Sequence, residues 1–375
     1  MLSKKHNKLI NMEKKDINIC IDSRALLGSG GIPQYTEHLI KNLETEGKTL
    51  YLFCNSLRKI EQYKFRFLKV FTRIPNKIFN FSLLLFGWPK INKMIERKIS
   101  KKIDLYFLPN INFWRDKDAK KIVVAHDLSY VVNPKFFCFR DRVWHKIINP
   151  KRLYTEADIV IAVSHNTKKD LINFFNIPEE KIKVIYPGVN VDATELQNKK
   201  ENYILYLANL EPRKNILGLI DAYERILTDI DLVIAGGGHY KKQIKKRIKQ
   251  SSKKDRIKLI GYVKEGEKAK LISEAQLFVY PSFYEGFGFP PLEAQILGIP
   301  VVASLTSSMS EVLGSSAILI NPYNSLEISK AIDEILINDD LRDELIKRGW
   351  DNVRRFSWKN TAKQTIEVID ELISR

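Results

Sequence analysis

Apolar and polar residues follow one another along the chain in two series that predict buried strands separated by helices. Most of the segments between the apolar runs show helical periodicity, and the first of these begins at Pro33. Short, continuous apolar runs of the first series occur at residues 17–22, 49–54, 104–109, 121–126, 158–164 and 183–187. Such runs, alternating with helices, are typical of a parallel sheet covered on both faces.

A second series of the same kind follows, with apolar runs at residues 203–210, 231–237, 257–263, 277–282, 301–304 and 317–321. The segment 187–202 between the series is rich in Gly, Asn, Asp and Lys, which favours a linker. The pattern predicts an α/β protein with two Rossmann-like, doubly wound parallel-sheet domains that face each other across a cleft. Ligands of such sheets bind beyond the carboxyl ends of the strands.

These boundaries give an expected division of the chain. We expect residues 1–15 to be a disordered start, residues 16–188 an N-terminal domain and residues 189–355 a C-terminal domain. From residue 325 onward the pattern is helical, and residues 356–375 form a final amphipathic helix with no strand after it.

Composition supports a globular protein with two cores, because 44% of the 375 residues are apolar and 28% are charged. The formal charge of +18 fits anionic membranes, phosphorylated substrates or a compositional bias. The basic residues are dispersed and carry no aromatic RNA-binding signature, so no nucleic-acid partner is expected. Three cysteines without C-x-x-C spacing imply neither disulfides nor zinc and favour a reducing cytoplasm.

One strongly apolar stretch, residues 78–88, has two possible interpretations. It is too short to span a bilayer, which takes about 20 residues, and no long apolar run precedes the first strand as in a signal peptide. Basic residues follow it directly, at Lys90, Lys93, Arg97, Lys98, Lys101 and Lys102. The stretch is therefore either an ordinary core helix or a contact with an anionic membrane surface.

In the first domain, two strand ends carry candidate chemistry. Gly30 and Gly31 lie in a loop between the strand 17–22 and the helix from Pro33, where backbone N–H groups and a helix N-terminus can approach an anion. His126 ends the strand 121–126, at the expected ligand edge. The alternatives are a common glycine-rich turn and a packed histidine.

In the second domain, Arg213 and Lys214 follow the first strand and can hold a diphosphate, or form a solvated charge pair. The strongest element has Glu285 and Glu293 separated by seven residues after a buried strand. We expect the N–H groups of the loop, which holds Phe287, Gly288 and Phe289, to bind phosphate. Glu293 then accepts hydrogen bonds from ribose hydroxyls and Glu285 faces the sugar.

A divalent metal is the competing chemistry, because other nucleotide-sugar enzymes hold one with an Asp-x-Asp pair. Asp116-Lys-Asp118 and Asp229-Ile-Asp231 both precede strands, at the end of the sheet away from the ligand edge. We therefore assign both strings to turns and expect no metal.

The segment from Glu285 to Glu293 resembles the E-x7-E motif of the retaining glycosyltransferases of GT-B fold, in particular glycosyltransferase family four. The resemblance covers nearly the whole chain through Gly30-Gly31-Ile32, His126-Asp127, Ala162-Val-Ser164, Tyr186-Pro-Gly188-Val, Pro212-Arg-Lys-Asn215, Ala235-Gly-Gly237, Gly261-Tyr-Val263 and Ser308-Met-Ser-Glu311-Val. It implies the GT-B fold, in which the last helix crosses back to the N-terminal domain.

The resemblance also implies roles for single residues. By resemblance, Gly31 lets the first loop close on the donor, and His126 contacts the transferred sugar. Arg213 and Lys214 neutralise the diphosphate. Glu285 binds hydroxyls of the sugar, and Glu293 binds the ribose. The resemblance implies transfer with retained anomeric configuration, in which the leaving diphosphate helps to deprotonate the acceptor, without a cofactor. Replacing Glu285 or Lys214 is then expected to abolish transfer and leave the fold intact.

Asp22 and Arg24, together with the loop at Gly30 and the segment 126–128, resemble mannosyltransferase-like members that build bacterial surface polysaccharides on lipid carriers. The expected partners are GDP-mannose first and a UDP-hexose second, a lipid-linked oligosaccharide acceptor, and the anionic inner face of the cytoplasmic membrane, where the protein would be peripherally bound. The alternatives are a soluble acceptor or a non-catalytic sugar-nucleotide binder.

Overall fold

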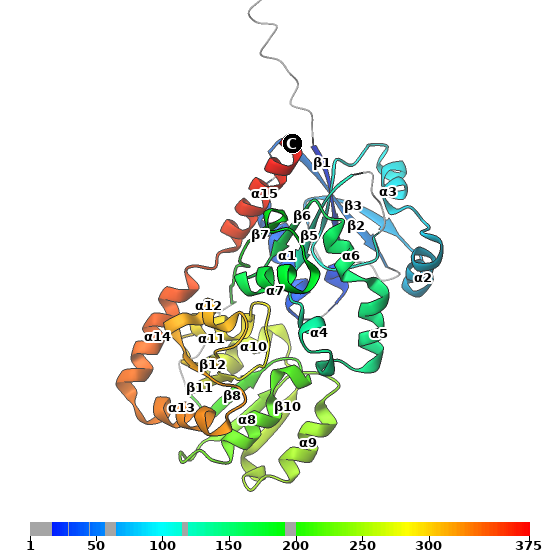
Figure 1. Cartoon of the computed structure of the whole chain (residues 1–375). Helices are drawn as coiled ribbons and strands as arrows, with labels where there is room; N and C mark the ends of the chain where they lie inside the picture. The colour runs from blue at the N-terminus through cyan, green and yellow to red at the C-terminus, as the bar shows by residue number, and fades with distance from the viewer. Residues whose placement is uncertain (1–16, 29, 45, 57–64, 115–118, 192–199) are drawn as a thin grey trace, which may run out of the picture.

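The computed structural model describes residues 17–28, 30–44, 46–56, 65–114, 119–191 and 200–375. The expected disordered start and the Asp116-Lys-Asp118 string lie outside the described residues, as does half of the predicted linker, residues 192–199. Within the described residues the chain forms two parallel sheets, each with its own helices (Figure 1). This arrangement confirms the predicted fold class.

The first sheet has the strand order β3-β2-β1-β4-β5-β6-β7, and all of its paired strands are parallel. Its strands are β1 (Ile17–Asp22), β2 (Lys48–Asn55), β3 (Leu68–Thr72), β4 (Leu105–Leu108), β5 (Lys120–Ala125), β6 (Ile159–Ala162) and β7 (Ile182–Val184). The sequence pattern missed β3, because an edge strand buries little of its surface: Leu68 and Lys69 are exposed, and Val70 is buried.

Helices cover both faces of this sheet because its strands are apolar on both sides. Ile19 and Ile21 face α1 and α15, whereas Cys20 between them belongs to the cluster with α2, α3, α6 and α7. The helices of the first domain are α1 (Gly31–Asn42), α2 (Asn76–Phe86), α3 (Ile91–Ile99), α4 (Ser129–Val132), α5 (Phe139–Ile148), α6 (Pro150–Thr155) and α7 (His165–Phe175).

The second sheet has the strand order β10-β9-β8-β11-β12-β13, again with parallel pairs. Its strands are β8 (Tyr203–Leu207), β9 (Asp231–Ala235), β10 (Ile257–Gly261), β11 (Leu277–Tyr280), β12 (Val301–Ser304) and β13 (Ile318–Ile320). Its helices are α8 (Ile216–Tyr223), α9 (Lys241–Lys249), α10 (Glu265–Ser273), α11 (Phe289–Ile296), α12 (Met309–Leu313), α13 (Ser325–Ile337) and α14 (Asp339–Val353).

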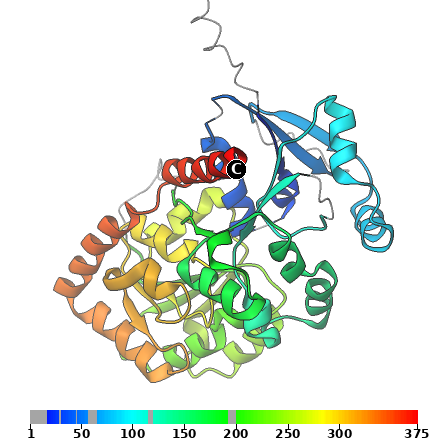
Figure 2. The ribbon, with the colours of Figure 1, turned by 45° about the horizontal axis from the view of Figure 1, so that its top comes forward.

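The last helix, α15 (Trp358–Ser374), leaves the second domain and packs against α1 of the first, as Figures 1 and 2 show. Lys48 pairs with Asp370, and Lys183 with Glu371. Gly188 is required at the crossing, because a Cβ there would stand 2.2 Å from the backbone nitrogen of Trp358. The helix thus joins the two domains at the side of the cleft. Among the described helices, none has the length and apolar character that crossing a membrane requires.

Candidate active site between the two sheets

The candidate residues come together where the carboxyl ends of the two sheets face each other. The loop with Gly30 follows β1 and His126 follows β5; Lys214 follows β8 and Glu285 follows β11. Parallel strands deliver the loops that follow them to one edge of a sheet, which explains why segments far apart in sequence share one site.

Glu285 lies at the centre of a buried cluster with two cations. Its Oε1 accepts a hydrogen bond from Lys214 Nζ at 2.6 Å, and its Oε2 lies 3.2 Å from Arg213 NH1. Lys214 Nζ also donates to the Tyr280 hydroxyl at 2.7 Å. Burial by itself raises the pKa of Glu285, but the charges of Lys214 and Arg213 outweigh burial and lower this pKa to about 2.

This burial changes one expectation from the sequence. Glu285 and Lys214 are both buried, so replacing either leaves the other as an uncompensated charge. Breaking a buried ion pair on one side typically costs about 3–5 kcal/mol of stability. Variants at either position are therefore expected to lose stability as well as activity, instead of leaving the fold intact.

The loop after Glu285 is held against the first domain. A Cβ on Gly286 would stand 1.8 Å from the backbone oxygen of His126, so the two domains touch here in a way that only glycine allows. Gly288 precedes α11 with φ +92°. The side chain of Phe287 is buried against Phe289, so only the backbone of Phe287 is available to a donor phosphate.

Glu293, near the start of α11, is buried, and hydrogen-bond partners reach one of its two carboxylate oxygens. Its Oε1 accepts from Lys268 Nζ at 2.6 Å and lies 3.3 Å from Gln34 Nε2 of the other domain. In the described part of the chain its buried Oε2 has no hydrogen-bond partner. A hydroxyl that donates to this oxygen would remove the cost of the unpaired acceptor, as the ribose role predicted for Glu293 requires.

The first glycine loop reaches the second domain. Gly30 has φ +89°, and a Cβ on Gly31 would stand 3.2 Å from the ring of Phe289. The charges of Asp22 and Arg24 are not free to bind a donor. They form a buried pair at 2.7 Å, and the Arg24 guanidinium also lies over aromatic rings, including that of Phe53.

His126 is oriented by its neighbours. Its Nε2 lies 2.7 Å from the carbonyl oxygen of Pro109, and its ring meets that of Tyr35 edge-on at 5.0 Å. Burial lowers the pKa of His126, so the ring is neutral at pH 7. Because a carbonyl only accepts, Nε2 carries the proton and Nδ1 is left as an acceptor.

Two contacts between the domains involve residues for which the sequence predicted no role. Glu311 of α12 accepts from the backbone N–H groups of His165 at 3.0 Å and Asn166 at 2.9 Å, at the N-terminus of α7. The Tyr284 hydroxyl, beside Glu285, donates to Asp170 of α7 at 2.6 Å. Glu311 lay in a recognised motif, but Asp170 had no sequence signal.

The second Asp-x-Asp string is used for ion pairs. Asp229 pairs with Arg256 at 2.5 Å, and Asp231 with Lys258 at 2.6 Å. Asp231 begins β9, so both carboxylates lie at the end of the sheet away from Lys214 and Glu285. Neither carboxylate faces the candidate site.

Two protein-family models match adjacent parts of the chain. A model described as glycosyltransferase family 4 matches residues 29–193, and one described as glycosyl transferases group 1 matches residues 190–351. Together they cover most of both domains, residues 29–351, and all of the candidate site residues.

Bacterial mannosyltransferases are among the curated relatives. The O-antigen chain mannosyltransferase B of Escherichia coli is 29% identical over 279 residues, which cover 70% of this chain and 73% of that protein. The serotype-specific mannosyltransferase WbdA of E. coli is 28% identical over 278 residues, or 68% of this chain. The match spans only about a third of WbdA, 34% of its length.

Solved structures share the fold over nearly the whole length. Sucrose-phosphate synthase from Thermosynechococcus elongatus superposes with a TM-score of 0.73 at 18% identity, covering 96% of this chain and 99% of that one. HepE of Anabaena in complex with UDP gives a TM-score of 0.69 at 18% identity, covering 95% of this chain and 100% of that one.

Proposed function

We propose that this chain, which belongs to the GT-B glycosyltransferases of family four, transfers a hexose from a nucleotide-diphosphate sugar to a glycan acceptor with retention of anomeric configuration. The observation that carries this proposal is the buried cluster of Glu285 with Lys214 and Arg213, together with the Glu293 oxygen that has no hydrogen-bond partner among the described residues. It offers positive charge for a diphosphate and an acceptor for a ribose hydroxyl at one edge of the cleft.

Each residue of the site has a task in this reaction. Arg213 and Lys214 stabilise the negative charge that develops on the departing diphosphate. His126 accepts from a hydroxyl of the transferred sugar through Nδ1. The bond from the anomeric carbon to the diphosphate oxygen breaks as the acceptor oxygen binds on the same face of the sugar. The diphosphate takes the proton of the acceptor hydroxyl.

We expect mannose as the transferred sugar and GDP-mannose as the donor, with a UDP-hexose as the second candidate. Support comes from the mannosyltransferases of O-antigen synthesis among the relatives, and the UDP complex of HepE supports a nucleotide-sugar partner in general. The buried Asp22–Arg24 pair does not strengthen the choice of mannose, because its charges are used within the first domain.

A lipid-linked acceptor and contact with the inner face of the cytoplasmic membrane complete the proposal. Residues 78–88, expected to be either a core helix or a membrane contact, lie mostly in α2, which has apolar side chains both in the core and exposed. Phe79 and Leu83 lie in the core. The exposed apolar side chains of α2 are Ile78, Phe81, Leu85 and Phe86, and Trp88, which follows the helix, is exposed as well. A helix without a polar face needs a second apolar environment.

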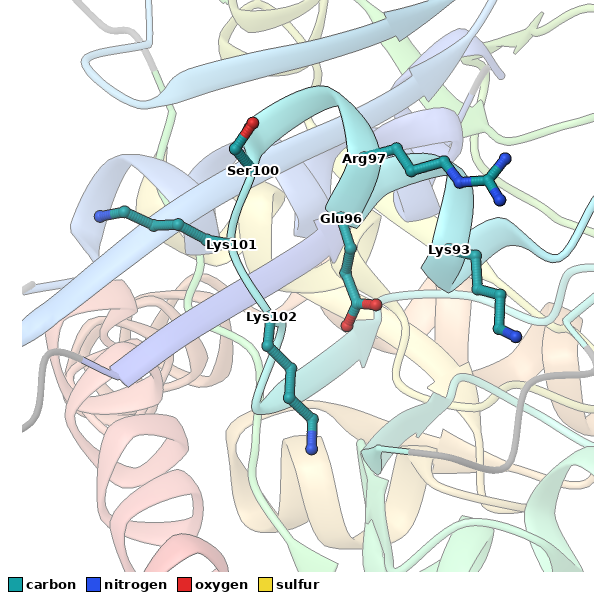
Figure 3. A pocket seen from close by; sticks show the side chains of 6 residues that line it. All are labelled: Lys93, Glu96, Arg97, Ser100, Lys101 and Lys102. Atoms are coloured by element: carbon teal, nitrogen blue, oxygen red, sulfur yellow. The ribbon is translucent and has the colours of Figure 1, made fainter.

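The end of α3, the helix that follows α2 in the chain, forms a basic hollow of about 450 Å³ (Figure 3). It is lined by Lys93, Glu96, Arg97, Ser100, Lys101 and Lys102. Four cations against one carboxylate suit the phosphates of an anionic leaflet. The exposed apolar side chains of α2 and this basic hollow are the two features that peripheral membrane binding requires.

The test is transfer from a panel of labelled nucleotide sugars to purified membranes that contain the lipid-linked acceptor. We expect incorporation from GDP-mannose above all other donors. Incorporation from a UDP-hexose into a water-soluble acceptor would replace this assignment. Tight binding of a nucleotide sugar without any turnover would show a non-catalytic binder.

A further inference from the structure

A second exposed apolar face lies on α5, in a part of the chain that the sequence analysis did not connect with membranes. Phe139 is 75% exposed, and Val143, Trp144 and Ile147 are 38%, 42% and 42% exposed. Residues 139, 143 and 147 recur every fourth position and so share one side of the helix, with Trp144 beside them. In α5 only Ile148 is buried.

The helix is attached to the edge of the candidate active site. The ring of His145 stacks on Tyr130, which follows the His126 segment, at a centroid distance of 4.3 Å. Just before α5, Phe136 stacks on Phe283 of the second domain at 6.0 Å. The side chains of α5 therefore have a fixed place relative to His126 and to the loop with Glu285.

The position of α5 relates it to the other exposed helix. Figures 1 and 2, which differ by a turn of 45°, both place α5 and α2 on the same flank of the first domain. The two helices are separated by about 50 residues in the chain. Helix α2 comes before strands β4 and β5, and α5 comes after them. Their shared flank is a product of the fold.

Charge on α5 indicates what covers this face. Arg140, Arg142 and Lys146 are exposed around the apolar residues, against one carboxylate, Asp141. A protein partner would need a matching acidic surface, whereas an anionic leaflet supplies both negative charge and an apolar interior. The same combination occurs at α2 and the hollow of α3.

We propose that α5 is a second bilayer contact, which inserts Phe139 and Trp144 into the same anionic leaflet as α2 and so fixes the orientation of the cleft toward the membrane. One helix allows the molecule to rotate about its point of contact, and two contacts remove that freedom. The purpose of the contact rests on the proposed function, because only a membrane-bound acceptor needs a fixed cleft. The contact itself can be measured without turnover.

Tryptophan fluorescence provides the first test, because Trp144 marks α5 and Trp88 marks α2. Vesicles of phosphatidylglycerol and brominated phosphatidylcholine quench a tryptophan only where it enters the acyl region. We expect quenching to persist in Trp88→Phe and to disappear in Trp88→Phe with Trp144→Phe. Trp114 and Trp358 are buried, and Trp350 lies on α14 of the second domain, so these three serve as the unquenched background in every variant. Equal quenching in the single and double variants would overturn the proposal.

Sedimentation with the same vesicles, without bromine, provides the second test. Phe139→Ser with Trp144→Ser should weaken binding on the order of tenfold or more. The matched control is Ile337→Ser with Trp350→Ser in the second domain, whose side chains are 76% and 47% exposed and lie away from this flank. The control should bind as the wild type does. Melting temperatures of both variants identify any loss of folding.

The remaining outcomes separate this inference from the proposed function. If the α5 variant binds vesicles like the wild type, or if it dissociates a dimer of the wild type, the face has another occupant and the inference fails, although transfer can persist. If Trp144 is quenched and no nucleotide sugar is ever turned over, the proposed function fails and the bilayer contact stands. Transfer to a short, water-soluble acceptor analogue should be equal in the α5 variant and its control.

Discussion

At the scale of single residues, the buried group of Glu285, Lys214 and Arg213 joins stability to function. We expect Glu285→Gln to lower the free energy of unfolding by about 3 kcal/mol, because Lys214 loses its ionised partner inside the protein. Transfer should fall on the order of 100-fold or more, since the sugar loses a charged acceptor. Chemical denaturation and donor kinetics measure the two effects.

The control is the pair of replacements Glu285→Gln with Lys214→Met, which removes both charges of the pair. Its unfolding free energy should recover part of the loss seen in Glu285→Gln, while transfer stays absent because the diphosphate has lost Lys214. A single Glu285→Gln variant with wild-type stability and wild-type transfer would remove this residue from the site.

The same carboxylate makes stability depend on pH in a stated direction. The pKa of Glu285 falls from 4.5 to about 2 in the fold, so the native state binds the fewer protons between these values. Its contribution to stability is complete above pH 4.5 and is lost as the pH falls toward 2. The stability difference between wild type and Glu285→Gln should therefore shrink in denaturation experiments as the pH is lowered from 6 to 3.

Arg213 and Lys214 also bear on the role of metals. Under the proposed function, these two cations and the N-terminus of α11 take the place of the positive charge that Mg²⁺ brings to nucleotide-sugar enzymes of another fold. We expect transfer to survive EDTA unchanged. Complete loss of activity on chelation, with recovery on adding Mn²⁺, would instead require a metal site and would contradict the proposed role of the two cations.

At the scale of elements, α7 is one of the helices of the first domain that the second domain contacts. Glu311 accepts two N–H groups of its first turn, where the helix dipole favours a carboxylate. Glu311→Ala should weaken the closed arrangement by about 1–2 kcal/mol and so raise the donor KM on the order of tenfold. Steady-state kinetics and nucleotide-diphosphate titration test this.

Glu327→Ala is the matched control, because Glu327 also accepts a backbone N–H, that of Asn321, but within one domain. Its donor KM should equal that of the wild type. If Glu311→Ala and Glu327→Ala give the same donor KM, the contact of Glu311 with α7 has no part in closing the cleft.

At the scale of the whole molecule, the exposed apolar side of α2 and the hollow of α3 predict salt-dependent membrane binding. Each basic residue near an anionic leaflet contributes about 1 kcal/mol, and this attraction falls as ionic strength rises. Binding to phosphatidylglycerol vesicles should weaken as NaCl increases. Replacing Lys90, Lys93, Lys101 and Lys102 with Gln should weaken it further, without changing transfer to a soluble acceptor.

Lys98 is left out of this variant because it donates a hydrogen bond to the backbone carbonyl of Phe71 on the edge strand β3. Its loss would mix a local structural effect with the change in charge. A wild type that does not bind anionic vesicles at low salt would show that the positive charge of this surface is compositional, and a soluble acceptor would become the better assignment.

The sequence by itself determined the fold class and most of the strands, and it named the candidate residues of the site. Continuous apolar runs gave twelve of the thirteen described strands, because both faces of a central parallel strand are buried and the pattern has no ambiguity. Gly31, His126, Lys214, Glu285 and Glu293 were named from strand ends and from one spaced motif, since in parallel sheets the chain order places such loops at one edge.

Tertiary structure alone decided what surrounds each of these residues. Burial converts Glu285 and Lys214 from cleft charges into an ion pair on which folding depends, and it leaves one oxygen of Glu293 unpaired. Glu311 contacts the N-terminus of α7 at His165, a residue 146 positions away in the chain. The apolar residues of α2 and α5 have helical spacing whether they face the core or the outside. Periodicity records which residues share a side, and only the packed fold shows whether anything covers it.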